Sequence, residues 1–218
     1  MHSDFTTTPT PTTPTTPTPV VVPLLGSVLG VAVVSLVLGA VTSWAQGFLP
    51  DAWAPLANSP SGWAALTAVV VMAFRPTLRW GAVLGAVSFF CLVLGYTFAS
   101  ELRGLAYDPT LWGAIGLVTG PVIGAAAAGA ASTRSIPVAL GSGVLAGVLV
   151  ADGIYGLTVV AATTSPVYWT TVLVLGLVVV LATPLRLRAV SPTVVMLIAS
   201  ISATAALSWG SAWLNNRA

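Results

Sequence analysis

Charge is the scarcest property of this 218-residue chain, because 6% of its residues are charged and 56% are hydrophobic. A soluble domain carries roughly 25% charged residues. Lysine is absent, and all seven basic residues are arginines. A phosphate-binding loop that depends on lysine is therefore excluded, and no basic cluster is large enough for a nucleic-acid surface. The composition predicts instead that most of the chain lies in a lipid bilayer.

Cysteine and histidine are almost absent as well. Cys91 is the only cysteine, so an intramolecular disulfide and a cluster of thiolate metal ligands are excluded. His2 is the only histidine, which removes Ser–His nucleophiles and metal sites built on histidine. Asp152 has no second membrane-embedded carboxylate with which to form an aspartyl dyad. We therefore expect a protein that is not an enzyme and that uses no cofactor and no metal.

Two regions are predicted from the distribution of apolar residues. Residues 1–19 are dominated by threonine and proline, a composition typical of a disordered tail with polyproline character. The tail contains no lysine or arginine before the first apolar run, so it does not resemble a signal peptide. Residues 20–218 are predicted to form an all-α transmembrane domain.

Seven apolar segments are predicted to be helices, at residues 20–46, 60–74, 80–99, 110–131, 136–163, 167–183 and 193–214. Four of them begin where a capping side chain directly precedes proline, at Ser59-Pro60, Asp108-Pro109, Ser165-Pro166 and Ser191-Pro192. Segment 60–74 covers only about 22 Å, short of the roughly 30 Å hydrocarbon core. It is either a short span with local bilayer thinning or part of a re-entrant hairpin.

The arginines predict the orientation of the chain. With seven crossings, one side of the membrane receives Arg75, Arg79, Arg134, Arg186 and Arg188. The positive-inside rule makes that side cytoplasmic, which places the N-terminus inside and the C-terminus outside. Seven of the eight tryptophans then fall near the outer interface, as aromatic residues prefer. We expect a multi-pass protein of a bacterial plasma membrane.

Glycines spaced four residues apart predict where helices pack closely. The stripes Gly116, Gly120, Gly124 and Gly143, Gly147 are the strongest examples, and such stripes let helix backbones approach each other in lipid. Packing within the chain is the favoured use, with a homo-oligomer or a membrane-protein partner as the alternative.

Asp152 is the one acidic residue inside a long apolar run, and it is the main candidate for a functional site. A carboxylate in hydrocarbon is costly and is normally turned inward, protonated or paired. The nearby polar candidates are Tyr155, Tyr96, Glu101, Arg103 and Asn58. Either these residues close an outward-facing pocket around Asp152, with Arg103 as counter-charge, or Asp152 braces a helix junction.

Several short motifs resemble a known family. Leu56-Ala-Asn-Ser, Gly95-Tyr96, Glu101-Leu-Arg-Gly104, Gly120-Pro121 and Ala151-Asp152-Gly-Ile-Tyr155 occur in this order. Together they are similar to a family of small actinobacterial integral membrane proteins known only as a domain of unknown function. The resemblance covers roughly residue 20 to the C-terminus and implies a membrane location but no activity. Glutamate is common in that family where Asp152 stands, and the shorter side chain leaves a carrier role open.

Two classes of function fit these features. A small permease or substrate-capture subunit would use Asp152 to bind a small polar or cationic solute. A non-transporting scaffold or assembly factor would instead use the glycine stripes to bind another membrane protein. The lipid bilayer is an expected partner in both cases.

Overall fold

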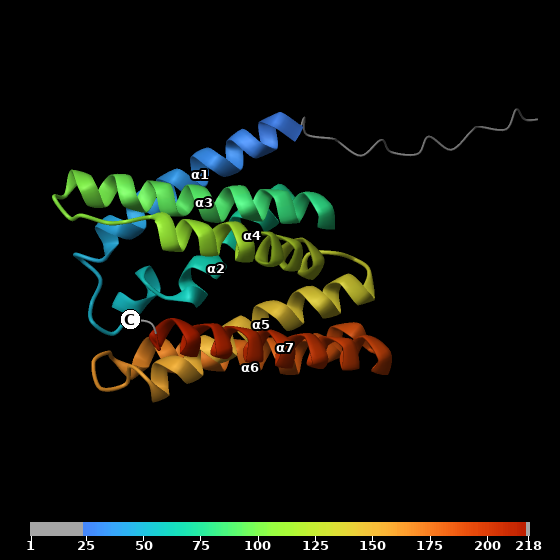
Figure 1. Ribbon diagram of the computed structural model, residues 1–218. Coiled ribbons are helices and arrows are strands. Elements are labelled where there is room, and N and C mark those ends of the chain that lie inside the picture. The colour runs from blue at the N-terminus through green and yellow to red at the C-terminus, as the bar shows by residue number, and fades with distance from the viewer. Residues whose placement is uncertain (1–23, 217–218) are drawn as a thin grey trace, which may run out of the picture.

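The computed structural model describes residues 24–216, which form seven α-helices, one short 3-10 helix and no strand (Figure 1). The elements are α1 (Leu24–Ala45), η1 (Ala54–Ala57), α2 (Pro60–Phe74), α3 (Leu78–Leu102), α4 (Thr110–Ala130), α5 (Ser135–Thr158), α6 (Pro166–Leu187) and α7 (Val190–Asn215). The predicted all-α bundle is confirmed, and each of the seven predicted segments is a helix. The threonine- and proline-rich tail at 1–19 lies outside the described residues.

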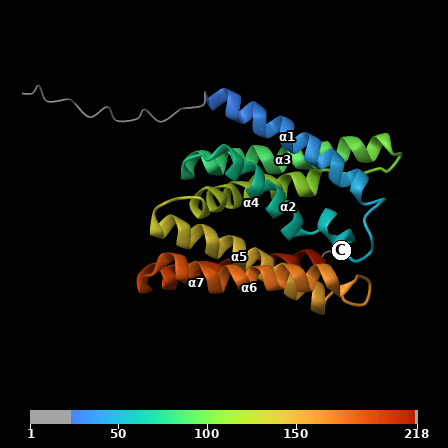
Figure 2. The same cartoon turned by 180° about the vertical axis from the view of Figure 1, so that it is seen from behind.

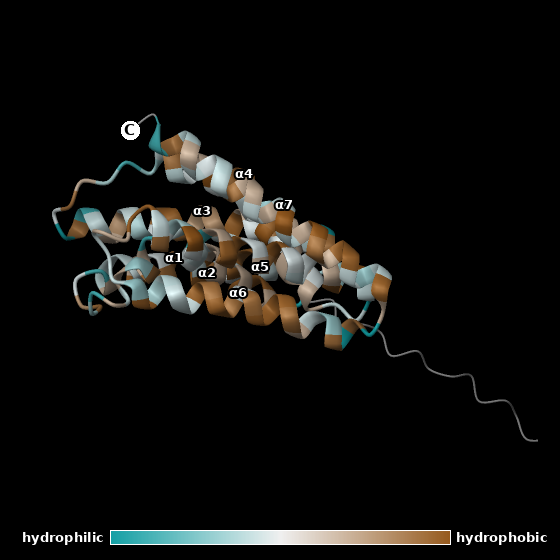
Figure 3. Ribbon diagram, turned by 90° about the horizontal axis from the view of Figure 1, so that it is seen from below, coloured by the Kyte–Doolittle hydropathy of each residue, from teal (hydrophilic) through white to brown (hydrophobic). Residues whose placement is uncertain are grey.

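Six of these helices are long and apolar enough to cross a membrane, and α2 is the exception. Helix α2 has 15 residues, as its segment predicts, and so extends about 22 Å. Helix α3 has 25 residues and extends about 37 Å. Figure 3 shows hydrophobic residues along the long helices and hydrophilic residues towards the two ends. The chain is therefore a multi-pass membrane protein.

The short helix α2 lies inside the bundle, packed against α1, α3, α4 and α5 (Figures 1 and 2). Eight of its 15 residues are buried. Val71 is in its buried face, in a core that includes Leu84 of α3 and Ile123 of α4. By contrast, α6 and α7 expose large apolar side chains, such as Leu185 and Val190, on the outside. The most enclosed helix of the bundle is thus the one that is too short to cross it.

The local capping signals predict helix starts with one exception. The Ser59 hydroxyl accepts from the Gly62 N–H, and the Ser165 hydroxyl accepts from the Val167 N–H. The Asp108 carboxylate likewise accepts from the N–H of Thr110, the first residue of α4. Helix α7, however, begins at Val190 rather than at 193. Ser191 and Pro192 therefore lie in its first turn, where proline is tolerated because that turn has no intrahelical donor bonds to lose.

The end of α5 also differs from its prediction. The helix ends at Thr158 rather than at 163. The N–H groups of Thr163 and Thr164 both turn back to the Val160 carbonyl. Residues 159–163 are mostly exposed, at the end of the bundle. Their apolar composition does not distinguish this exposed turn from a continuation of the helix.

The predicted glycine stripes lie at close contacts between helices of this chain. A Cβ on Gly120 would approach the Gly85 carbonyl oxygen to 2.6 Å, and a Cβ on Gly124 would collide with the Gly81 carbonyl. Gly116 faces the Phe89 ring, also on α3. On α5, a Cβ on Gly143 would lie 2.5 Å from the Met196 oxygen of α7, and Gly147 is equally close to Ser200. Backbones meet at both interfaces, so only glycine fits there.

The charged residues divide between the two ends of the bundle. The α2–α3, α4–α5 and α6–α7 connections meet at one end, where Arg186 donates to the carbonyls of Ala130 and Ser132. We call this the arginine end; it carries Arg75, Arg79, Arg134, Arg186 and Arg188. Helix α1 starts at this end and α7 finishes at the opposite one (Figure 1). That the arginine end faces the cytoplasm stays a prediction from the positive-inside rule.

Candidate functional site

Asp152 lies in the interior of the bundle and is 2% exposed. It is six residues before the end of α5, about 9 Å along the helix axis. Its Oδ2 atom accepts a hydrogen bond of 3.0 Å from the backbone N–H of Ser61, near the start of α2. The membrane-embedded carboxylate is therefore turned inward, onto the N-terminus of the short helix.

This contact completes the hydrogen bonding of the first turn of α2. Pro60 occupies the first helical position and has no N–H. The Ser61 N–H donates to Asp152, the Gly62 N–H donates to the Ser59 hydroxyl, and the Trp63 N–H donates to the Ser59 carbonyl. A helix start otherwise leaves its first N–H groups without partners. In a lipid-embedded bundle each such group costs several kcal/mol, so Asp152 and Ser59 together make an internal helix start tolerable.

A tyrosine from α6 joins the same group. The Tyr168 hydroxyl lies 2.7 Å from the Ser59 hydroxyl and 2.7 Å from the Ser61 hydroxyl. All three side chains are at most 2% exposed. We call Ser59, Ser61, Asp152 and Tyr168 the α2 cap cluster. It joins α2, α5 and α6 through polar contacts in the interior of the bundle.

Two aromatic rings pack against Tyr168 of the cluster, one from the α1–α2 connection and one from α6. The Trp53 ring packs edge-on against Tyr168 at 6.5 Å between centroids, and Trp169 packs against Tyr168 at 5.0 Å. Trp53 directly precedes η1 and is 40% exposed. The connection between α1 and α2 thus places one partly exposed ring against a buried member of the cluster.

The cluster combines two chemical properties. A carboxylate and three hydroxyl groups provide acceptors suited to a cationic or polar group. The N-terminus of a helix carries partial positive charge, which favours a carboxylate in the position of Asp152. The start of α2 therefore stabilises the Asp152 carboxylate where it lies, next to the three hydroxyl groups.

The structure separates Tyr155 from Asp152, although they are three residues apart. Positions i and i+3 differ by about 60° around a helix, and these two side chains go to different neighbours. Asp152 points to α2, while the Tyr155 hydroxyl pairs with Asn215 of α7 at 3.3–3.4 Å. Tyr155 is therefore outside the α2 cap cluster.

Tyr96 lies in a separate aromatic group between α1, α2 and α3. Its hydroxyl donates to Gln46 Oε1 at 2.9 Å, and its ring is 5.6 Å from Trp63 and 4.8 Å from Tyr107. Burial, with smaller contributions from Tyr96 and Asp108, raises the pKa of Tyr107 to about 12. Tyr107 is therefore neutral at physiological pH and contributes a ring and a hydroxyl rather than a charge.

Arg103, the counter-charge suggested by the sequence, contacts α1 instead of Asp152. Its Nη1 donates to the Ser43 carbonyl and, at 3.3 Å, to the Ser43 hydroxyl. Its guanidinium lies 5.6 Å from the centroid of the Trp44 ring. Glu101 is exposed at the end of α3. The positive partner of Asp152 is instead the N-terminus of α2. Hydropathy and the count of charged residues do not predict this partner.

Asn58 is exposed and ends η1, with its N–H bonded to the Pro55 carbonyl. It directly precedes the cluster but no contact joins its side chain to Asp152 among the described hydrogen bonds. The cluster members that the site prediction left out are Ser59, Ser61 and Tyr168. Only Ser59 carries a local signal, as a cap before proline; serine and tyrosine on apolar helices otherwise look like ordinary packing residues.

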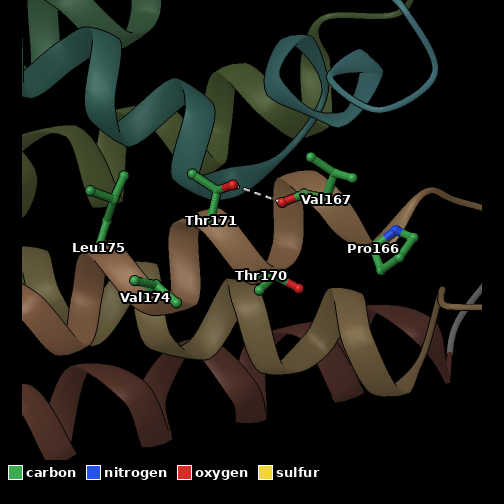
Figure 4. Close-up of a pocket in the computed structure, with 6 residues that line it drawn as sticks. All are labelled: Pro166, Val167, Thr170, Thr171, Val174 and Leu175. Carbon is green, nitrogen blue, oxygen red and sulfur yellow. Dashed lines mark hydrogen bonds between the residues drawn. The ribbon is translucent and has the colours of Figure 1, made fainter.

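Two surface cavities lie away from the cluster. One of about 490 Å³ runs along α6 and is lined by Pro166, Val167, Thr170, Thr171, Val174 and Leu175 (Figure 4). The Thr171 hydroxyl donates to the Val167 carbonyl of its own helix. The other, of about 500 Å³, lies at the arginine end. Asp152 lines neither of these two cavities and is buried.

No set of three or more metal-ligating side chains gathers within residues 24–216. No curated protein and no solved structure matches the chain. A family model described as a family of unknown function, DUF6518, matches residues 18–216. This match spans the whole described bundle, and the chain belongs to that family of unknown function, DUF6518.

Proposed function

We propose that the protein is a small membrane carrier or substrate-capture subunit in which Asp152 binds a cationic or polar solute. One observation carries the proposal: a buried carboxylate and three hydroxyl groups converge at the start of a short internal helix. Transporters commonly form solute sites where a helix starts or breaks inside the membrane, because backbone and side-chain groups are available there.

Binding in this site would be an exchange of partners. A cation that pairs with Asp152 competes with the Ser61 N–H for the carboxylate, and Tyr168 can then reorient its hydroxyl. Loss of the 3.0 Å bond releases the start of α2 from α5. Solute binding is thereby coupled to a relative movement of two helices, which is what alternating access needs.

The alternative of a scaffold has less support. It depends on glycine stripes that dock another protein, but Gly120 and Gly124 face α3, and Gly143 and Gly147 face α7. These stripes are covered by the chain's own helices.

The test uses Asp152→Asn and Asp152→Ala in the full chain, purified in detergent. Asparagine caps a helix about as well as aspartate, so Asp152→Asn keeps an acceptor for the Ser61 N–H and removes the charge. Asp152→Ala removes both. Thermal unfolding is followed by tryptophan fluorescence against a panel of small ammonium and guanidinium compounds, with neutral polyols of similar size as the comparison set.

We expect at least one cation to raise the melting temperature of the wild-type protein and to lose this effect in Asp152→Asn. Asp152→Ala should melt at a lower temperature than Asp152→Asn without any solute, because a backbone donor is then unpaired. A cation that stabilises wild type and Asp152→Asn equally would refute the binding role. A panel without any stabilising solute, combined with low stability of both variants, would show that Asp152 is a brace only.

A further inference from the structure

The arginine end has a strong positive charge that no acidic residue offsets within residues 24–216. Five arginines lie in its connections or in the adjoining helix turns, and all five are exposed. The described acids lie in the other half of the bundle: Asp51, Glu101, Asp108 and Asp152. A surface of this kind attracts anions.

A pocket of about 500 Å³ lies within this charged surface. It is enclosed by the α2–α3 connection, the end of α4 and the α4–α5 connection. Arg75, Thr77, Ser132 and Thr133 provide its polar lining, and Met72 and Leu78 provide apolar walls. The pocket thus offers a guanidinium and hydroxyl groups on one part of its surface and hydrocarbon on another.

Arg75 stands where its backbone favours a different residue. It ends α2 with φ of 47°, in the left-handed region, where glycine is the usual residue. Arginine at this position costs about 1 kcal/mol more than glycine. Arg188 ends α6 in the same way, with φ of 51°, but does not line the pocket.

We propose that this pocket binds the headgroup of an anionic phospholipid. A guanidinium forms paired hydrogen bonds with phosphate oxygens. The Thr77 side chain lines the pocket and forms no capping bond at the start of α3, and the first N–H groups of a helix favour an anion such as phosphate. Arg186 is engaged by the carbonyls of Ala130 and Ser132 and holds the wall of the pocket.

The neighbouring side chains favour a lipid over a free phosphate ion. Leu78 is 45% exposed and Trp80 is 41% exposed, both in the first turn of α3. Tryptophan at this level is typical of a membrane interface. Acyl chains can lie along these side chains while the phosphate occupies the polar part of the pocket, and a free anion would use only the polar part.

The test compares Arg75→Gln with Arg188→Gln in the full chain. The two arginines share the same end of the bundle and the same backbone conformation, so Arg188→Gln controls for loss of charge and for the left-handed position. Purified protein in a nonionic detergent is titrated with phosphatidylglycerol, with phosphatidylcholine and with inorganic phosphate, and binding is measured by native mass spectrometry and by thermal unfolding.

We expect phosphatidylglycerol to bind in preference to phosphatidylcholine, with an about fivefold loss of affinity in Arg75→Gln and little change in Arg188→Gln. Equal binding of the two lipids would overturn the proposal, as would equal losses in both variants, which indicate a diffuse charge effect. Stabilisation by inorganic phosphate as strong as that by phosphatidylglycerol would overturn the choice of a lipid.

Discussion

At the scale of single residues, the hydrogen bonding at the start of α2 explains why Asp152 lies in the membrane. Helix α2 begins about 9 Å inside the end of α5, where water is not freely available to its first N–H groups. Asp152 and Ser59 provide the acceptors that water provides elsewhere. The carboxylate therefore has a structural role, and the proposed binding role must be tested with variants that separate the two.

Ser59→Ala should be more damaging than the same change at the other Ser-Pro start, Ser165→Ala. Ser59 is 2% exposed, caps the Gly62 N–H at 3.1 Å and contacts the Tyr168 hydroxyl. Removal of its hydroxyl leaves a buried donor unpaired, at a cost of about 1–3 kcal/mol. Ser165 caps an exposed helix start, where water can replace it, and its loss should cost about 0.5 kcal/mol. Chemical unfolding of both variants in detergent measures the difference, and equal losses would contradict the account given for α2.

Residue-level prediction from the sequence succeeds where the cause is local. The cap at Ser59 is encoded by its neighbours Pro60 and Gly62, so it can be read from the chain. The partners of Ser61, in contrast, are 91 and 107 positions away, at Asp152 and Tyr168. Charge alone predicts that Arg103 pairs with Asp152, but the position of Arg103 at the end of α3 directs its side chain to Ser43 of α1. Such pairings depend on how helices face each other, which composition does not specify.

At the scale of elements, the bundle combines long helices that face outward with one short helix inside. The apolar runs predict all seven helices, and the length of α2 follows from the same pattern. Its enclosed position does not, because an apolar helix in a membrane protein looks alike whether lipid or protein covers it. The glycine spacing is a better predictor of which helix faces pack together, since Gly81 and Gly85 of α3 meet Gly120 and Gly124 of α4 backbone to backbone.

Gly124→Ala should destabilise the protein, while Gly26→Ala should not. A Cβ on Gly124 collides with the Gly81 carbonyl, and α3 and α4 must separate to admit it. Overpacking of this kind costs about 1–3 kcal/mol. Gly26 of α1 has no atom within 4 Å of the added carbon, and alanine also favours the helix. Thermal unfolding of the two variants is the measurement, and a Gly124→Ala protein as stable as wild type would mean that α3 and α4 are not held this closely.

At the scale of the whole molecule, charge and aromatic residues define two unlike ends. Five arginines lie at the end where α1 begins, and seven of the eight tryptophans lie in the opposite half, at or near the ends and connections of the helices. The prediction of this division required only the correct number of helices, because each helix reverses the chain. Which end faces the cytoplasm depends on insertion into the membrane, and the fold alone is compatible with either.

Cysteine labelling in intact cells decides the orientation. The only native cysteine is replaced first, as Cys91→Ala, and a single cysteine is then introduced at one of two exposed alanines, Ala106 or Ala189. Ala106 lies in the α3–α4 connection and Ala189 lies in the α6–α7 connection, at the arginine end. If the arginine end is cytoplasmic, a membrane-impermeant maleimide should label Ala106→Cys in intact cells and should label Ala189→Cys only after permeabilisation. The reverse pattern would place the arginine end outside. It would also place the pocket that we propose to bind an anionic phospholipid away from the negatively charged inner leaflet.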